Sequence, residues 1–250
     1  MYNKFPGKDV TPEDTTSKFP LVTNYSNNAF EVSGVKFNTK KIPVMAGPNM
    51  VESEDLIVKT ALAVKSAGAS FLRGGAFKPL SFPYRSEKYN ESGLEGLKWL
   101  KTAKDEAGIP VITELMEEKY LDDICQVTDI IQIGSRNMQN FPLIVEAAKT
   151  GVPLMIKRHY GASLRDWLGA AEYALKYGCE KLILCERGMS IPHTHRSTSR
   201  FILDLQAIQA LKELTTFPVI SDPSHASFWA PYVPGLTYAS ISANCDGLII

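Results

Sequence analysis

The sequence predicts an α/β protein with a TIM (β/α)8 barrel. Short apolar runs alternate with helix-length amphipathic stretches from residue 42 to residue 250. The apolar runs are hydrophobic on both faces, as strands of a parallel sheet are when helices cover them. Eight such alternations in a chain of 250 residues fit one barrel better than an open doubly wound sheet.

Eight apolar runs, most of them rich in β-branched residues, are the expected strands. In chain order they are IPVMAG, ASFLRGG, IPVITEL, DIIQIG, VPLMIKR, KLILCERG, FPVISDPSH and CDGLII. The sequence contains neither G-x-G-x-x-G nor a P-loop, which argues against an open nucleotide-binding sheet.

Helices are expected in the stretches between these strands. In SEDLIVKTALAVKSAG, Ser53 is a suitable N-cap. Ile57, Ala61 and Val64 then fall on one face, and Gly68 follows as a stop signal. The stretch from residue 163 to residue 178 repeats this pattern. Both stretches are predicted to be amphipathic helices on the outside of the barrel.

The residues before the barrel form two segments. Residues 1–29 are expected to be a polar lead-in, and residues 30–41 a β-hairpin with a turn at Ser33-Gly34. The barrel domain is then residues 42–250. The hairpin is expected to close the N-terminal mouth of the barrel. The sequence stops at the end of the eighth strand, so an eighth helix is absent from it, as in a shortened chain or an unusual variant.

Composition excludes several classes of partner. The 27 basic and 27 acidic residues balance, so neither nucleic-acid binding nor membrane binding is expected. No apolar run is long enough to cross a bilayer, and the first residues lack the apolar stretch of a signal peptide. The four cysteines form no C-x-x-C pair, which indicates a reduced, cytoplasmic protein.

Cationic residues stand at the ends of several expected strands. Because the carboxyl ends of the strands meet at one mouth of a TIM barrel, these side chains are expected to face one another. Several cations in one place are costly unless an anion neutralises them, and arginine suits phosphate and carboxylate. The expected ligand is a small molecule with several negative charges, and Glu114 and Glu186 are expected to orient the cations. The cations are Arg73, Lys78, Arg136, Lys157, Arg158 and Arg187.

Seven motifs occur at these strand ends, in order, between residues 42 and 250. They are AGPNMVES, LRGGAFKP, ITE, IIQIGSRNMQN, LMIKR, ILCERG and DPSH. Together they resemble the 3-deoxy-7-phosphoheptulonate (DAHP) synthase family. The most similar branch is the small, class I microbial form, which is related to 3-deoxy-manno-octulosonate-8-phosphate synthase.

The resemblance implies a transferase that forms a C–C bond. Such an enzyme condenses phosphoenolpyruvate with a phosphorylated aldose and releases phosphate, and DAHP synthases serve the shikimate pathway to aromatic amino acids. The resemblance also implies catalytic roles for Lys78, Asn49 and His225, and a homo-oligomer that is a dimer or a tetramer. The residues that match the family's phosphoenolpyruvate site are Arg73, Lys78, Arg136, Lys157 and Arg187.

The family's metal ligands are mostly missing from this sequence. Metal-dependent members carry a cysteine at the position of Asn49, a histidine matched by His225, and two later carboxylates. The sequence ends at Ile250, before either carboxylate position, so His225 is the only retained ligand. An amide oxygen replaces a thiolate poorly. No tightly bound metal is therefore expected unless the native chain extends beyond Ile250. Asn49 resembles the metal-independent branch, and a turn residue is its alternative role.

The aldose is less well defined by the sequence. Family members that use erythrose 4-phosphate carry K-P-R-T, where this chain has Lys78-Pro79-Leu80-Ser81. Pro79 and Ser81 are the expected second-substrate residues. Leu80 replaces a phosphate-binding arginine, which predicts poor use of erythrose 4-phosphate.

Two further groups of residues carry weaker signals. His193 and His195 form an H-x-H, which is interpreted as two solvated loop residues rather than as metal ligands. The stretch after DPSH is aromatic, and packing in the core or at an oligomer interface is expected for it, with a cover over a less polar substrate as the alternative. Its aromatic residues are Phe228, Trp229, Tyr232 and Tyr238.

Two other functions remain open at this point. One is a non-catalytic family member that binds phosphoenolpyruvate or phosphate as a regulatory or structural protein. The other is a class I aldolase, for which Lys157 is the candidate Schiff-base residue. The full set of cations favours the transferase.

Overall fold

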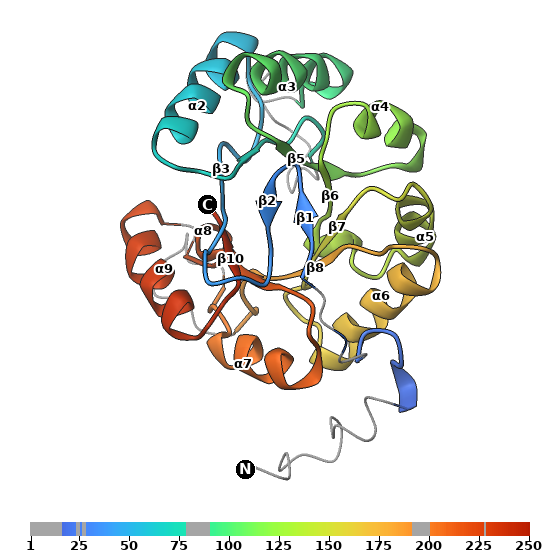
Figure 1. The fold of residues 1–250 in the computed structure, drawn as a ribbon. Helices are drawn as coiled ribbons and strands as arrows, with labels where there is room; N and C mark the ends of the chain where they lie inside the picture. The colour runs from blue at the N-terminus through green and yellow to red at the C-terminus, as the bar shows by residue number, and fades with distance from the viewer. Residues whose placement is uncertain (1–16, 24–25, 27–28, 79–90, 192–200, 228) are drawn as a thin grey trace.

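The fold is seen in a computed structural model of the chain (Figure 1). The structure describes residues 17–23, 26, 29–78, 91–191, 201–227 and 229–250. Within these residues, no helix is both long enough and apolar enough to cross a membrane.

Eight parallel strands close into a barrel, which confirms the predicted fold class. Each strand pairs with the next along the chain, and the last pairs with the first, so that Leu248 lies opposite Val44. The strands are β3 (Val44–Ala46), β4 (Phe71–Arg73), β5 (Val111–Leu115), β6 (Ile130–Ile133), β7 (Leu154–Lys157), β8 (Leu182–Glu186), β9 (Val219–Ser221) and β10 (Gly247–Ile249).

Helices surround the barrel in the connections between successive strands, and both α8 and α9 lie between β9 and β10 (Figure 1). They are α2 (Glu54–Ser66), α3 (Gly93–Ala107), α4 (Leu121–Cys125), α5 (Phe141–Lys149), α6 (Leu164–Lys176), α7 (Leu205–Leu214), α8 (Pro223–Ser227) and α9 (Val233–Ser242). In the described part of the chain, β10 is the last element.

The predicted helix starts are confirmed. The Ser53 hydroxyl accepts a hydrogen bond from the Leu56 amide at the start of α2. At the start of α6, Ser163 and Asp166 form a reciprocal capping box. Such caps satisfy amide groups that have no partner inside the helix.

The apolar residues form two separate cores. The outer core lies between the strands and the helices and includes Trp167, which is fully buried and donates a hydrogen bond to the Ile156 carbonyl at 3.2 Å. The inner core lies inside the barrel and takes alternate residues from the strands, as the period of two requires. Its strand residues are Met45, Phe71, Ile112, Ile130, Met155, Ile183, Cys185, Ile220 and Ile249.

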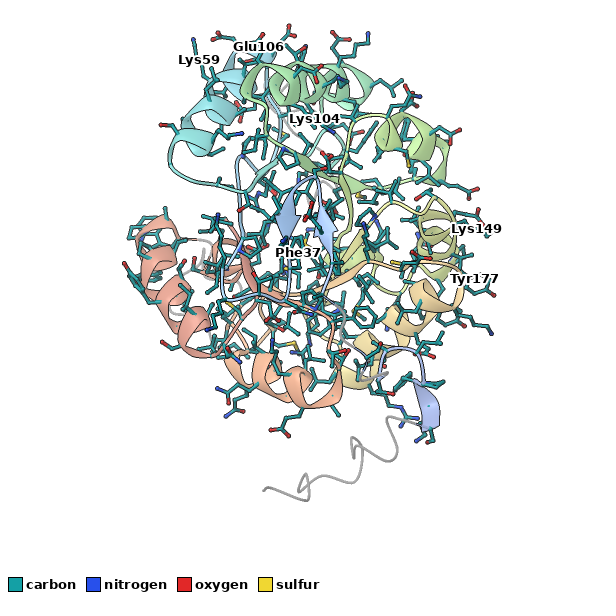
Figure 2. All side chains as sticks on the ribbon, in the orientation of Figure 1. Phe37, Lys59, Lys104, Glu106, Lys149 and Tyr177 are labelled. Carbon is teal, nitrogen blue, oxygen red and sulfur yellow. The ribbon has the colours of Figure 1, made fainter. Side chains whose placement is uncertain are left out.

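A hairpin of β1 (Glu31–Val32) and β2 (Val35–Lys36) covers one end of the inner core. Phe37, just after β2, is fully buried; its ring centroid lies 5.1 Å from that of Phe30 and 6.0 Å from that of Phe71. Figure 2 places Phe37 in the middle of the ring of strands. Because Phe71 is the first residue of β4, the hairpin closes the amino-terminal end of the barrel, as predicted.

The aromatic residues in and before α9 are exposed. Trp229, Tyr232 and Tyr238 have exposed fractions of 39%, 45% and 72%, so these three residues do not pack in the core of the chain, and their packing at an oligomer interface stays a prediction. Phe228 lies outside the described residues. No charged residue occurs between His225 and Asp246, so the sequence has no polar pattern here that distinguishes an exposed face from a buried one.

Candidate active site

A polar layer lies directly above the inner core, at the carboxyl end of the barrel. It follows from the strand period, because the residue two positions after an inner-core residue points to the same side. The pairs are Phe71 and Arg73, Ile112 and Glu114, Ile130 and Gln132, Met155 and Lys157, Cys185 and Arg187, and Ile220 and Asp222. The polar side chains of this layer therefore lie directly above the apolar residues of the inner core.

A cavity opens above this layer. Arg73, Lys78 and Lys157 are the cations in its wall, and Glu114 is the carboxylate. Asn49 and His225 complete its polar lining, with Gln132. The excess of cations in a partly desolvated space favours an anionic ligand. The remaining lining residues are Pro48, Gly74, Gly75, Ile112 and Thr113.

Lys78 is held by two acceptors. Its Nζ donates to Asn49 Oδ1 at 2.9 Å and lies 3.4 Å from Glu114 Oε2. Burial lowers the pKa of Lys78 to about 8; Glu114 opposes this shift, and Arg73 and Lys157 add to it. Gly75 leaves room for the side chain, because a Cβ there would lie 2.2 Å from Lys78 Cε.

Glu114 is a shared acceptor inside the polar layer. Gln132 Nε2 donates to Glu114 Oε2 at 3.0 Å, and Lys78 contacts the same oxygen. The prediction that Glu114 orients a cation is confirmed. Gln132 was missed from the sequence, although its place two residues after the apolar Ile130 would have identified it.

Asp222 links the other cation to the histidine. Its Oδ2 accepts from Lys157 Nζ at 2.6 Å and lies 2.7 Å from His225 Nδ1. Burial alone would raise the pKa of Asp222, but His225 and Lys157 hold it well below its usual range. Burial lowers the pKa of His225 to about 4, against the opposing effect of Asp222. A neutral imidazole that donates from Nδ1 to Asp222 presents the Nε2 lone pair towards the cavity.

Arg73 contacts the loop after β3 and the histidine. Its Nε donates to the Gly47 carbonyl at 3.2 Å, and Nη1 lies 3.5 Å from His225 Nδ1. The guanidinium is therefore fixed between the ends of β3 and β9, with only 9% of the residue exposed. Burial lowers its pKa.

The other predicted cations are not among the residues that line the described cavity. Arg136 is exposed after β6, and Arg187 follows β8 with 8% of its surface exposed. Arg158 is buried, and its Nη1 binds Glu186 at 3.0 Å and Asp204 at 2.9 Å. The orienting role predicted for Glu186 is therefore confirmed at Arg158.

Several predicted residues lie outside the described part of the chain. They are the second-substrate residues Pro79 and Ser81, with Leu80, and the histidines His193 and His195. A hydrogen bond joins the described residues on either side of residues 79–90. Glu91 accepts it from the Lys78 amide at 2.9 Å.

The described donors do not fit a divalent metal. Asn49 Oδ1 and His225 Nε2 converge at 3.2 Å, but both ligands are neutral, and the amide oxygen already accepts from the Lys78 ammonium. Among the residues that the structure describes, no group of three or more His, Cys, Asp or Glu side chains is placed to hold a metal. A cation here would face Arg73, Lys78 and Lys157, whose charges Glu114 and Asp222 offset only in part.

The arrangement has clear relatives among known proteins. The sequence model of the "DAHP synthetase I family" matches residues 26–250. Phospho-2-dehydro-3-deoxyheptonate aldolase of Thermotoga maritima is 33% identical over 247 residues, which cover 99% of this chain and 68% of that protein. The 2-dehydro-3-deoxyphosphooctonate aldolase of Francisella tularensis is 28% identical over 232 residues, which cover 85% of this chain and 81% of that protein.

Solved structures agree with these matches. The crystal structure of the Thermotoga maritima DAHP synthase superposes with a TM-score of 0.82 at 32% identity, and covers 91% of this chain and 64% of that chain. A truncated form of the same enzyme gives a TM-score of 0.83, with 93% of this chain and 84% of that chain covered. The present chain thus spans less than two thirds of the longer crystallised chain.

Proposed function

Because the chain belongs to the DAHP synthetase I family, we propose that it condenses phosphoenolpyruvate with a phosphorylated aldose and releases phosphate. The relatives are named as aldolases of the heptonate and octonate series, both of which are C–C bond-forming enzymes. The non-catalytic alternative gains no support from them. Pairing of Lys157 with Asp222 also gives the class I aldolase no support.

One observation carries the proposal. Arg73, Lys78 and Lys157 converge on one cavity at the carboxyl end of a closed barrel. Phosphoenolpyruvate carries a phosphate and a carboxylate, and its negative charges offset the excess of cations in the wall. Arg136 and Arg187 are proposed as further binding residues at the edge of this site, from the family resemblance and their places after β6 and β8.

The reaction requires a nucleophile, an acid and a water. C3 of phosphoenolpyruvate attacks the aldehyde carbon, and the aldehyde oxygen takes up a proton. Water adds at C2, and the C2–O bond to phosphate then breaks, which leaves the keto group and inorganic phosphate. The water gives up both of its protons in these steps, one to balance the proton taken up by the aldehyde oxygen and one to the leaving phosphate. Fixed cations stabilise the negative charge of the tetrahedral intermediate without reorganising.

Lys78 is the proposed proton donor to the aldehyde oxygen. Its pKa of about 8 lies near the operating pH, where a general acid is most effective. Asn49 and His225 lie beside it, and we assign them to hydrogen bonding of the aldehyde or the attacking water.

The second substrate is proposed to be a phosphorylated aldose other than erythrose 4-phosphate. Pro79 and Ser81 are its proposed contacts, and the departure at Leu80 supports a different sugar. A cytoplasmic homo-oligomer is also proposed; four cysteines without disulfides support a reducing compartment.

The test is phosphate release from phosphoenolpyruvate with a panel of phosphorylated and free aldoses. We expect release that depends on one class of aldose and is abolished in Lys78→Met. Lys59→Met is the matched control, because Lys59 lies on the outer surface of α2 (Figure 2). Binding of phosphoenolpyruvate without turnover of any aldose would instead favour the non-catalytic alternative.

A further inference from the structure

The Arg187 guanidinium lies over the ring of Phe201, 4.3 Å from the ring centroid. We propose that Phe201 is a positioning residue for Arg187, and that it fixes the guanidinium for an anionic substrate. This inference rests on the proposed function, because it assumes that Arg187 binds phosphoenolpyruvate. Phe201 comes from a different segment of the chain, beyond the end of β8.

The contact has the geometry of a cation–π interaction. A cation within about 6 Å of an aromatic centroid is attracted by the ring, more strongly when the pair is desolvated. Arg187 has only 8% of its surface exposed, so desolvation favours the contact here. Stacking engages the flat face of the guanidinium, whereas the N–H groups that bind phosphate lie in its plane. A stacked arginine is therefore oriented without loss of its binding edge.

Phe201 is itself held in place on two sides. Met189 and Ile202 form an antiparallel bridge, in which the Met189 amide donates at 2.8 Å and the Ile202 amide donates at 3.0 Å. The ring of Tyr160, after β7, stacks on Phe201 with centroids 5.4 Å apart. Phe201 is thus fixed to the ends of both β7 and β8.

Gly188 permits the close approach of Phe201. A Cβ at Gly188 would lie 2.7 Å from the Phe201 Cβ, and its φ of +101° disfavours any other residue. Arg187 and Gly188 are adjacent, so the same turn that directs the arginine also admits the ring beneath it. The backbone turn at Gly188 therefore fixes the Phe201 ring relative to the Arg187 guanidinium.

The first test compares variants that keep the ring with variants that lose it. Phe201→Leu removes the ring but keeps apolar volume, and Phe201→Tyr keeps the ring. We expect Phe201→Leu to weaken phosphoenolpyruvate binding about tenfold, as the loss of a partly buried cation–π contact would. Phe201→Tyr should stay within about twofold of the wild type. Phe201→Met provides a second ring-free variant if Phe201→Leu fails to fold.

The second test separates positioning from general packing. In an Arg187→Ala background, Phe201→Leu should have no further effect on binding, because the group that it positions is gone. A persistent tenfold effect would assign Phe201 a purely structural role and overturn the inference. Phe141→Leu is the matched control, because Phe141 stacks on Tyr173 at 4.5 Å on the outer helices. It should leave binding unchanged.

The readout is calorimetric binding of phosphoenolpyruvate, with KM and kcat measured for the same variants. A positioning role predicts a higher KM for phosphoenolpyruvate and an unchanged KM for the aldose. If the wild type binds but Phe201→Leu binds equally well, only the role of Phe201 is wrong. If the wild type does not bind phosphoenolpyruvate, both this inference and the proposed function are wrong.

Discussion

The Lys78 ammonium donates a hydrogen bond to the side-chain oxygen of Asn49 at 2.9 Å. This contact joins the segment after β4 to the loop after β3, at the carboxyl ends of two neighbouring strands. It also explains why an amide stands at residue 49. An amide oxygen accepts from an ammonium without carrying a charge, so it holds Lys78 in place and leaves its positive charge available to an anion.

The first prediction concerns the charge of Lys78. Because its pKa is about 8, the ammonium loses its proton as the pH rises through that value. Above that pKa the dissociation constant of phosphoenolpyruvate should rise about tenfold per pH unit, because only the protonated lysine binds the anion. Calorimetric titrations between pH 7 and pH 9.5 would measure this. In Lys78→Met the affinity should be lower and the pH step absent; an identical step in that variant would assign it to another group.

The second prediction concerns Gly75. A Cβ at this position would lie 2.2 Å from Lys78 Cε and 2.8 Å from the Asn49 carbonyl oxygen. Gly75→Ala should therefore displace the lysine and the loop that holds it. We expect kcat to fall by at least tenfold, about 1.4 kcal/mol. The thermal midpoint should change much less than kcat. Gly235→Ala on α9 is the control, because no atom lies within 4 Å of a Cβ there. Normal turnover in Gly75→Ala would contradict the placement of Lys78.

The third prediction concerns stability at mildly acidic pH. His225 has a pKa of about 4 in the folded protein and an ordinary value of 6.5 when unfolded. Between these values the unfolded state binds more protons, so the free energy of unfolding should fall as the pH drops from 6.5 towards 4. Denaturant unfolding at several pH values would measure the slope. His225→Gln should have a shallower slope in this window, and an equal slope would exclude His225 as its source.

The fourth prediction concerns metal dependence. Two neutral donors do not compensate the charge of a divalent ion, and the nearby carboxylates Glu114 and Asp222 already contact Lys78 and Lys157. Activity of this chain should be unchanged by EDTA, and elemental analysis of protein purified without chelator should find no stoichiometric metal. Loss of activity in EDTA, with recovery on addition of zinc, iron or manganese, would refute the assignment of Asn49 and His225 to hydrogen bonding.

The barrel and its polar layer could be predicted because both follow from short-range rules. Strand period fixes which residues face inward, and barrel closure brings the strand ends together, so Arg73 and Lys157 could be placed from sequence alone. The strand period also puts Gln132 in the polar layer. Its role in the site could not be recognised from sequence, because a single amide does not indicate a particular chemistry. The cap residues Ser53 and Ser163 were equally predictable, since a cap depends on its own first helical turn.

The contacts of Arg158 and Arg187 could not be predicted. Arg158 binds Asp204, which is 46 residues away in sequence, and Arg187 lies on Phe201, beyond a segment outside the described residues. Such pairings depend on how loops return to the barrel, and strand period does not specify that. The exposure of Tyr238 has a similar origin, because hydrophobicity alone does not distinguish a buried aromatic face from one that lies at the surface.

The hairpin that seals the amino-terminal end determines how molecules reach the site. Phe37 and the inner core fill the barrel below the polar layer, so the described cavity can exchange molecules only through its upper mouth. A three-carbon substrate seated against Arg73 and Lys157 would lie beneath the aldose. The two substrates should therefore enter in a compulsory sequence, with phosphoenolpyruvate first. A non-reactive aldose analogue should then inhibit uncompetitively against phosphoenolpyruvate, whereas random entry would give a mixed pattern.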